Sequence, residues 1–185
     1  QAADREFEIR KEDEKNKCYI CQRAFDYGDR KDVLVGKKDY EYFALKRLQV
    51  WQMFDPNAKD DEDDFYKPIT TKEVEDLIEM KYVETIFDSD IHKWNIYESE
   101  CKDKVIEKDK LAFIIEDEDG NVFGAYINAK IHSHSVSIID KNVCVFSLRS
   151  NGRFVKPMKF KLKEKYFNRA FYLKDDGTEN TSSLF

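Results

Sequence analysis

Two cysteines near the start of the chain, Cys18 and Cys21, have the Cys-x-x-Cys spacing of zinc sites and redox pairs. A zinc site of this kind normally needs a second pair of ligands, and the sequence has no second Cys-x-x-Cys. Tyr19 and Ile20 favour a strand, in which residues three apart point to opposite faces. The sequence therefore predicts packed thiols without a metal, and leaves a thiol redox protein using Cys18 and Cys21 as an alternative.

The other metal-ligating residue types are scattered along the chain. His132 and His134 form a His-x-His pair that could complete a Cys2His2 zinc site. No feature of the sequence brings them to the cysteine pair. Cys101 and Cys144 stand alone. We therefore predict no metal site.

Two turns carry charges that could bind an ion. Asp117-Glu118-Asp119-Gly120 resembles the start of a calcium loop, but Val122 and Asn128 occupy the positions where an EF-hand needs Gly and Glu. A hairpin turn explains the same residues without a metal. Arg149 and Arg153 flank another turn, where two guanidinium groups could hold a phosphate or carboxylate. Arginines at the ends of a hairpin are more commonly exposed to solvent without binding an anion.

No catalytic residue and no cofactor site can be assigned from the sequence. The chain has no nucleophile elbow, phosphate loop, dinucleotide fingerprint or zinc-protease motif, and its carboxylates are too many for one acid–base pair to be singled out. The sequence therefore assigns no catalytic site and favours a binding protein over an enzyme.

Composition limits the class of protein. With 32 basic and 38 acidic residues the net charge is −6, which does not favour a nucleic-acid partner. No apolar run approaches the ~20 residues of a membrane-spanning helix. Four cysteines without a secretory signal indicate reduced thiols and a cytoplasmic location. The oligomeric state cannot be inferred.

An acidic segment divides the chain. Residues 54–65 contain a proline and a run of aspartates and no periodic apolar pattern, which is typical of a solvated linker. The alternative is a divalent-ion sensor that uses the acidic stretch at 59–64.

Periodicity predicts one helix and a series of strands. Thr70 and Glu73 match a capping box, and the apolar spacing that follows predicts a helix over 71–81. The stretch from Leu45 to Met53 carries bulk on both faces, so we expect a strand covered on both sides. Further strands are expected at 111–115, 122–127, 143–148, 160–163 and 170–173.

Three stretches of the chain together resemble the TLDc domain family. The first is Phe87-Asp88-Ser89-Asp90, with Trp94 and Tyr97, and the second is the hairpin from Ala112 to Tyr126, which contains the recurring "DG.VFGA" pattern. The third is Val143–Leu148, which is similar to the family's "FLFSL" strand.

The closing part of the family pattern stands at the start of this chain. It usually ends in a strand similar to "LEVW", and here Leu48-Gln49-Val50-Trp51 lies before the acidic segment, with Gln49 where Glu is common. We therefore predict a single domain, 1–185, in circularly permuted order. Residues 66–185 would form its first part, 1–53 its closing part and 54–65 a linker. Trp51 and Phe123 are expected to be buried in one core, and Gln1 is expected to lie near Phe185.

The resemblance implies an α+β fold, an antiparallel β-sandwich flanked by helices. It also implies a non-catalytic, regulatory protein-binding module that is tied to oxidative-stress protection. The implied partner is a subunit of the vacuolar-type proton-pumping ATPase (V-ATPase), whose assembly the family regulates.

Overall fold

The structure is a computed structural model, and it describes most of the chain. The described residues are 7–8, 17–20, 24–30, 32–36, 41–57, 71–94, 100–133, 136–151, 153 and 156–172. Their strands are β1 (Phe7–Glu8), β2 (Lys17–Ile20), β3 (Glu41–Phe54), β4 (Lys81–Asp88), β5 (Leu111–Asp117), β6 (Asn121–Ile127), β7 (Ser137–Ile138), β8 (Cys144–Ser150), β9 (Met158–Lys161) and β10 (Phe171–Tyr172). Their helices are α1 (Thr71–Ile78), α2 (Glu100–Val105) and the short 3-10 helix η2 (Glu164–Arg169).

All of the described strands except β7 and β10 belong to one antiparallel sheet. Its strand order is β1-β2-β3-β5-β6-β8-β9, with β4 also paired to β3. β7 and β10 form a separate antiparallel pair. The hairpin of β5 and β6 turns at Gly120, whose φ of 79° is the left-handed conformation that a tight turn requires.

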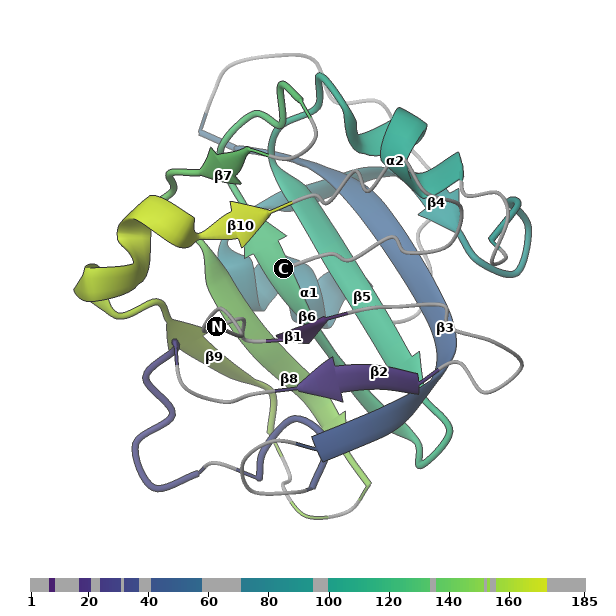
Figure 1. Cartoon of the computed structure of the whole chain (residues 1–185), viewed down its shortest axis with the longest axis vertical. Coiled ribbons are helices and arrows are strands. Elements are labelled where there is room, and N and C mark those ends of the chain that lie inside the picture. The colour runs from purple at the N-terminus through teal and green to yellow at the C-terminus, as the bar shows by residue number, and fades with distance from the viewer. Residues whose placement is uncertain are drawn as a thin grey trace.

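The long strand β3 is the centre of this arrangement. Its second half pairs with β4 on one edge, where Val50 lies opposite Phe87, and with β5 on the other, where Leu48 lies opposite Ile115. Its first half pairs with β2. Thus the closing part of the family pattern on β3 lies in one sheet with the three family-like stretches, which fall at the end of β4, on the β5–β6 hairpin and on β8 (Figure 1).

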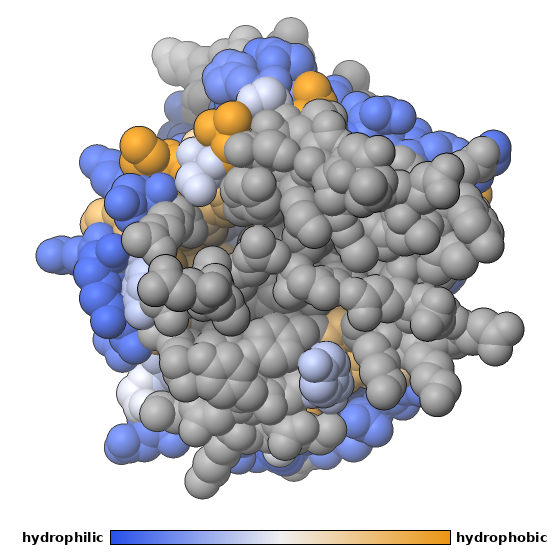
Figure 2. All heavy atoms as spheres, in the orientation of Figure 1, coloured by the Kyte–Doolittle hydropathy of each residue, from blue (hydrophilic) through white to orange (hydrophobic). Residues whose placement is uncertain are grey.

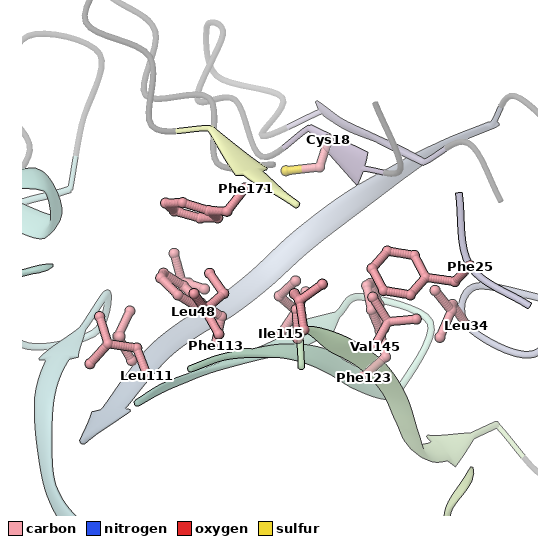
Figure 3. Packing of buried hydrophobic residues seen from close by; sticks show 14 of the residues in the cluster. Cys18, Phe25, Leu34, Leu48, Leu111, Phe113, Ile115, Phe123, Val145 and Phe171 are labelled. Atoms are coloured by element: carbon pink, nitrogen blue, oxygen red, sulfur yellow. The ribbon is translucent and has the colours of Figure 1, made fainter. Parts of the chain in front are cut away.

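Both faces of the central strands are buried, as the sequence predicted for β3. Seen in Figure 1, α1 lies behind them, while β1, β2, β7 and β10 lie in front. The front core contains Leu48, Phe113 and Phe171, and Figure 3 shows Phe171 and Cys18 facing the sheet across this layer. The back core contains Trp51 and Val74 of α1. The predicted α+β, sandwich-like antiparallel fold with few helices is therefore confirmed.

The segment before β3 closes the front core at the β8–β9 end. Phe25 forms an isolated bridge with Leu162, and the Lys163 amide donates to the Ala24 carbonyl at 3.0 Å. The Ser147 hydroxyl of β8 donates to the Val33 carbonyl at 3.0 Å. These buried contacts attach the early part of the chain to strands that lie more than a hundred residues later.

The expectation that Trp51 and Phe123 share one core is wrong. Both side chains are fully buried, but Trp51 belongs to the back core and Phe123 to the front core. Trp51 lies opposite Ala112, which lies opposite Tyr126. Phe123 is three residues from Tyr126, and since side chains alternate along a strand, it points to the other face.

The predicted helix over 71–81 is too long by its last turn. α1 ends at Ile78, and Glu79 has a φ of 63°, which takes the backbone out of the helix. Lys81 and Tyr82 extend as the start of β4 because they pair with Phe54 and Met53. Pairing with a strand from the other part of the chain overrides the apolar spacing on which the helix prediction rested. The sequence also gave no sign of α2.

Several expectations fall outside the described residues. They include the Thr70 cap, the acidic stretch at 59–64, and both chain ends with the proposed proximity of Gln1 and Phe185. The pairing of β3 with this chain's own β5 supports the single permuted domain of 1–185, which stays a prediction.

Gly124 supplies a first test of how tightly the sheet packs. A Cβ built on Gly124 would lie 2.0 Å from the Phe113 carbonyl oxygen and 2.8 Å from the Phe146 ring. We expect Gly124→Ala to lower the free energy of unfolding by about 3 kcal/mol, because backbone must move to relieve the overlap.

The matched control is Gly120→Ala, where the added Cβ meets no atom within 4 Å and only the positive φ is strained. It should cost about 1 kcal/mol in the same urea denaturation experiment. Equal losses in the two variants would contradict the close approach at Gly124.

Candidate functional site

A buried aspartate, Asp88, joins the end of β4 to β3. Its carboxylate accepts a hydrogen bond from Arg47 Nε at 3.0 Å on Oδ1, and Arg47 Nη2 donates to Oδ2. Gln49 Nε2 donates to Oδ2 at 2.9 Å, and the Asp90 amide donates to Oδ1 at 3.0 Å. Arg47 also forms an ion pair with Asp90 at 3.1 Å. We call Arg47, Gln49, Asp88 and Asp90 the Asp88 cluster.

The turn that follows Asp88 is fixed by further hydrogen bonds. The amides of Ile91 and His92 donate to the Asp88 carbonyl at 3.1 and 2.8 Å. The Asp88 amide donates to His92 Nδ1 at 2.9 Å, and the His92 ring stacks on Phe87. Ser89 pairs with Leu48 of β3 in both directions, through its amide and through its hydroxyl. The turn is thus anchored on β3 and has little freedom left.

The charge of Asp88 is stabilised by its partners. Burial alone would raise the pKa of this carboxyl, but the hydrogen bonds from Arg47, the Asp90 amide and Gln49 outweigh burial and hold the pKa below its ordinary value. Arg47 is correspondingly stabilised as a cation, because the bond to Asp88 raises its pKa. The cluster is an ion pair at neutral pH, and no proton is available there for general acid catalysis.

Gln49 occupies the position where the family commonly has a glutamate, and the structure shows what the amide does. Its Nε2 donates to the Asp88 carboxylate. A glutamate at this position would place a second negative charge beside Asp88 and could donate only if it were protonated. The departure noted in the sequence is therefore part of the hydrogen bonding of the cluster.

Ile91 projects from the turn that the Asp88 cluster orders. Its side chain is 78% exposed, although it is large and apolar. Charged residues of the cluster, Asp90 and Arg47, lie beside the turn. An apolar side chain on a rigid turn with a charged rim is the arrangement of a protein-binding anchor. No pattern in the sequence indicates Ile91, because its exposure depends on the fold of the turn.

Two of the described thiols, Cys101 and Cys144, are unsuited to redox chemistry. Burial raises the pKa of Cys144 to about 12 and raises that of Cys101 further. A reactive cysteine needs the thiolate at neutral pH. Cys18 is fully buried on β2, and Cys21 lies outside the described residues. The structure therefore describes one half of the Cys-x-x-Cys pair.

The remaining sequence candidates do not come together. In the described part of the chain no group of three potential metal-ligating side chains is present. His132 is exposed, with Nδ1 3.4 Å from Glu107 Oε1, and His134 is not described. Arg149 is exposed on β8.

Arg153 has a structural contact in place of an open anion site. Its Nη2 donates to Asn121 Oδ1 at 2.6 Å, and its guanidinium lies against Gly36. Asn121 in turn donates through its amide and its side chain to the buried Asp117 carboxylate. Asp117 thus orders the hairpin, which agrees with the hairpin interpretation of the acidic turn.

Comparison with known protein families decides the class of this domain. The family model described as "TLDc domain" matches residues 75–178, more than half of the chain, from α1 past β10. The chain belongs to the TLDc domain family. No curated protein and no solved structure gives a match. β3 lies outside the matched range, yet it pairs with two strands of the TLDc match.

TLDc domains are protein-interaction modules, and membership suggests a non-catalytic regulatory role in oxidative-stress resistance. None of the helices in the described part of this TLDc chain has the length and apolar composition needed to cross a bilayer.

The Asp88 cluster predicts a pH-dependent contribution to stability. Asp88→Asn should lower the free energy of unfolding by about 2 kcal/mol at pH 7, because it removes a charged acceptor from a buried pair. Since the folded pKa of Asp88 is lowered, this stabilisation is present above the unfolded pKa of about 4 and is lost as pH falls through the folded value.

Urea denaturation at pH 7 and at about pH 3 measures the effect. The difference between Asp88→Asn and the parent chain should shrink at the lower pH. Asp76→Asn is the control, because Asp76 forms only an exposed pair with Lys72 on α1. A deficit for Asp88→Asn that is the same at both pH values would contradict the charged cluster.

The absence of zinc at Cys18 and Cys21 stays a prediction. Protein prepared without added metal should contain no stoichiometric zinc by elemental analysis, since the buried Cys18 thiol packs in the front core (Figure 3). One zinc per chain, lost in Cys21→Ser, would show that this expectation is wrong.

Proposed function

We propose that this TLDc chain is a cytoplasmic, non-catalytic regulatory module that binds a subunit of the V-ATPase and so contributes to protection against oxidative stress. Family membership supports the class of function. The V-ATPase as partner comes from the resemblance of the sequence to this family. In this molecule, the observation that supports a protein partner is the exposed side chain of Ile91, which lies on the turn ordered by the Asp88 cluster.

The physical argument rests on preorganisation. The backbone of the turn is hydrogen-bonded at Ser89, Ile91 and His92, so little conformational entropy remains to be lost when a partner binds. Ile91 supplies apolar area that is already exposed in the free protein. Arg47 and Asp90 hold charge of both signs at its rim, which favours a partner with complementary charges.

The binding test uses Ile91→Asp in the otherwise intact chain. Because Ile91 is exposed, the substitution should leave the free energy of unfolding unchanged. The dissociation constant for purified soluble V-ATPase sector should rise by at least about tenfold, as expected when a central apolar contact is replaced by a charge. Biolayer interferometry or calorimetry measures the binding.

The control is Ser133→Asp, which adds the same charge at another exposed position. It should bind as the parent chain does. A parent chain that binds no V-ATPase subunit would refute the proposed partner. Equal binding by the parent and by Ile91→Asp would refute the role of Ile91 and leave the partner standing.

A further inference from the structure

A row of lysines follows the sheet edge opposite to β4. β9 is the edge strand, and lysines recur through it and into η2: Lys156, Lys159, Lys161, Lys163 and Lys165. Glu164 is the one acidic residue between Lys156 and Lys165. This segment of the sequence therefore carries a net positive charge in a chain whose net charge is −6, and the exposed Asp26 lies beside Lys161.

The alternation of β9 explains why these lysines reach solvent. Phe160 and Leu162 enter the front core, so Lys161 points away from it, and Lys161 and Lys163 are exposed. Lys165, on η2, is exposed as well. Figure 2 shows a hydrophilic rim on the side of the molecule where Figure 1 places β9 and η2.

An exposed apolar residue, Ile139, lies next to η2. Its side chain is 73% exposed. The backbone on both sides of it is joined to η2, because the Asp140 amide donates to the Phe167 carbonyl at 3.3 Å and the Ala170 amide donates to the Ile138 carbonyl at 3.0 Å. We call Ile139, Lys161, Lys163 and Lys165 the lysine-edge surface.

The aspartate beside Ile139 does not neutralise this surface. Asp140 is buried, and its Oδ2 accepts the amides of Asn128 and Ala129 at 2.7 and 3.0 Å. Its Oδ1 accepts the Asn142 amide at 2.8 Å. Within the described part of the chain, Lys161 and Lys165 form no ion pair with a carboxylate.

The backbone at the end of β9 is already hydrogen-bonded to an earlier segment of the chain. The Asp26 amide donates to the Lys161 carbonyl at 2.9 Å, and the Lys163 amide donates to the Ala24 carbonyl. A partner strand therefore cannot pair with the sheet at Lys161. A partner there would recognise side chains: the ammonium groups of Lys161 and Lys165, and Ile139 next to η2.

We propose that the lysine-edge surface binds an acidic segment of a partner protein that carries an apolar residue for Ile139. Charge complementarity and the exposed Ile139 identify the occupant: carboxylates pair with the lysines, and an apolar side chain of the same segment covers Ile139. This surface is independent of Ile91, since β9 and β4 lie at opposite edges of the sheet.

The test measures binding of a labelled peptide of glutamates around a central Leu-Phe pair by fluorescence anisotropy. The double variant Lys161→Glu/Lys165→Glu should weaken binding at least about tenfold, and Ile139→Ser about fivefold. Raising the salt from about 0.05 to about 0.5 M should weaken binding to the parent chain.

The matched control is Lys72→Glu/Lys108→Glu, which gives the same net charge at exposed positions on α1 and after α2. It should bind the peptide within about twofold of the parent. An equal loss in both double variants would show that only net charge matters and would overturn the proposal.

Two further outcomes would overturn it. One is tighter binding of single-stranded DNA or of phosphatidylserine vesicles than of the peptide through the same lysines. The other is a large gain in peptide affinity when the aspartates of 60–64 are replaced by asparagine, because the chain's own acidic segment would then be the occupant.

Discussion

The rest of this structure depends on the hydrogen bonding of β3 along both of its edges. Removal of an edge strand would break one ladder of hydrogen bonds. β3 pairs with β4 on one edge, with β5 on the other, and with β2 through its first half. Its two faces supply Leu48 and Val50 to the front core and Trp51 and Met53 to the back core. Antiparallel ladders pair backbone groups that would otherwise be buried without partners. β4 and β5, which lie within the TLDc match, therefore need β3 to complete their backbone hydrogen bonding.

Buried aspartates order the turns around that sheet. Asp88, Asp117 and Asp140 are each almost fully buried, and each accepts backbone amides of the turn beside it. A carboxylate is a strong acceptor that fixes several amides at once, so an irregular segment can be held without its own ladder. Only Asp88 among the three also meets an arginine, and burial raises the pKa of Asp117 where the Arg47 bond lowers that of Asp88.

Within the described residues, two exposed isoleucines lie beside turns held in this way. Ile91 follows Asp88, and Ile139 precedes Asp140. An apolar side chain that is exposed on an ordered turn adds no buried apolar area to the folded chain. Binding a partner would bury that side chain. Burial makes the Cys101 and Cys144 thiols unreactive. The two turns are therefore more informative about function than these cysteines. Ile91 follows β4 at one edge of the main sheet, whereas Ile139 follows β7 in the separate β7–β10 pair.

The sequence by itself determined the elements whose signal is local. The Asp-Gly turn and the alternating residues on either side of it predicted the β5–β6 hairpin, and bulk on both faces of 45–53 predicted a strand buried on both sides. The family could also be recognised, because its motifs are contiguous. Only the tertiary structure decided where α1 ends, that Trp51 and Phe123 face different cores, and what Asp88 binds. The hydrogen-bond partners of Asp88 on β3, Arg47 and Gln49, are 41 and 39 residues away along the chain. No periodicity encodes such a contact, since it exists only once β3 has paired with β4, and pairing between distant strands depends on the packing of the whole sheet.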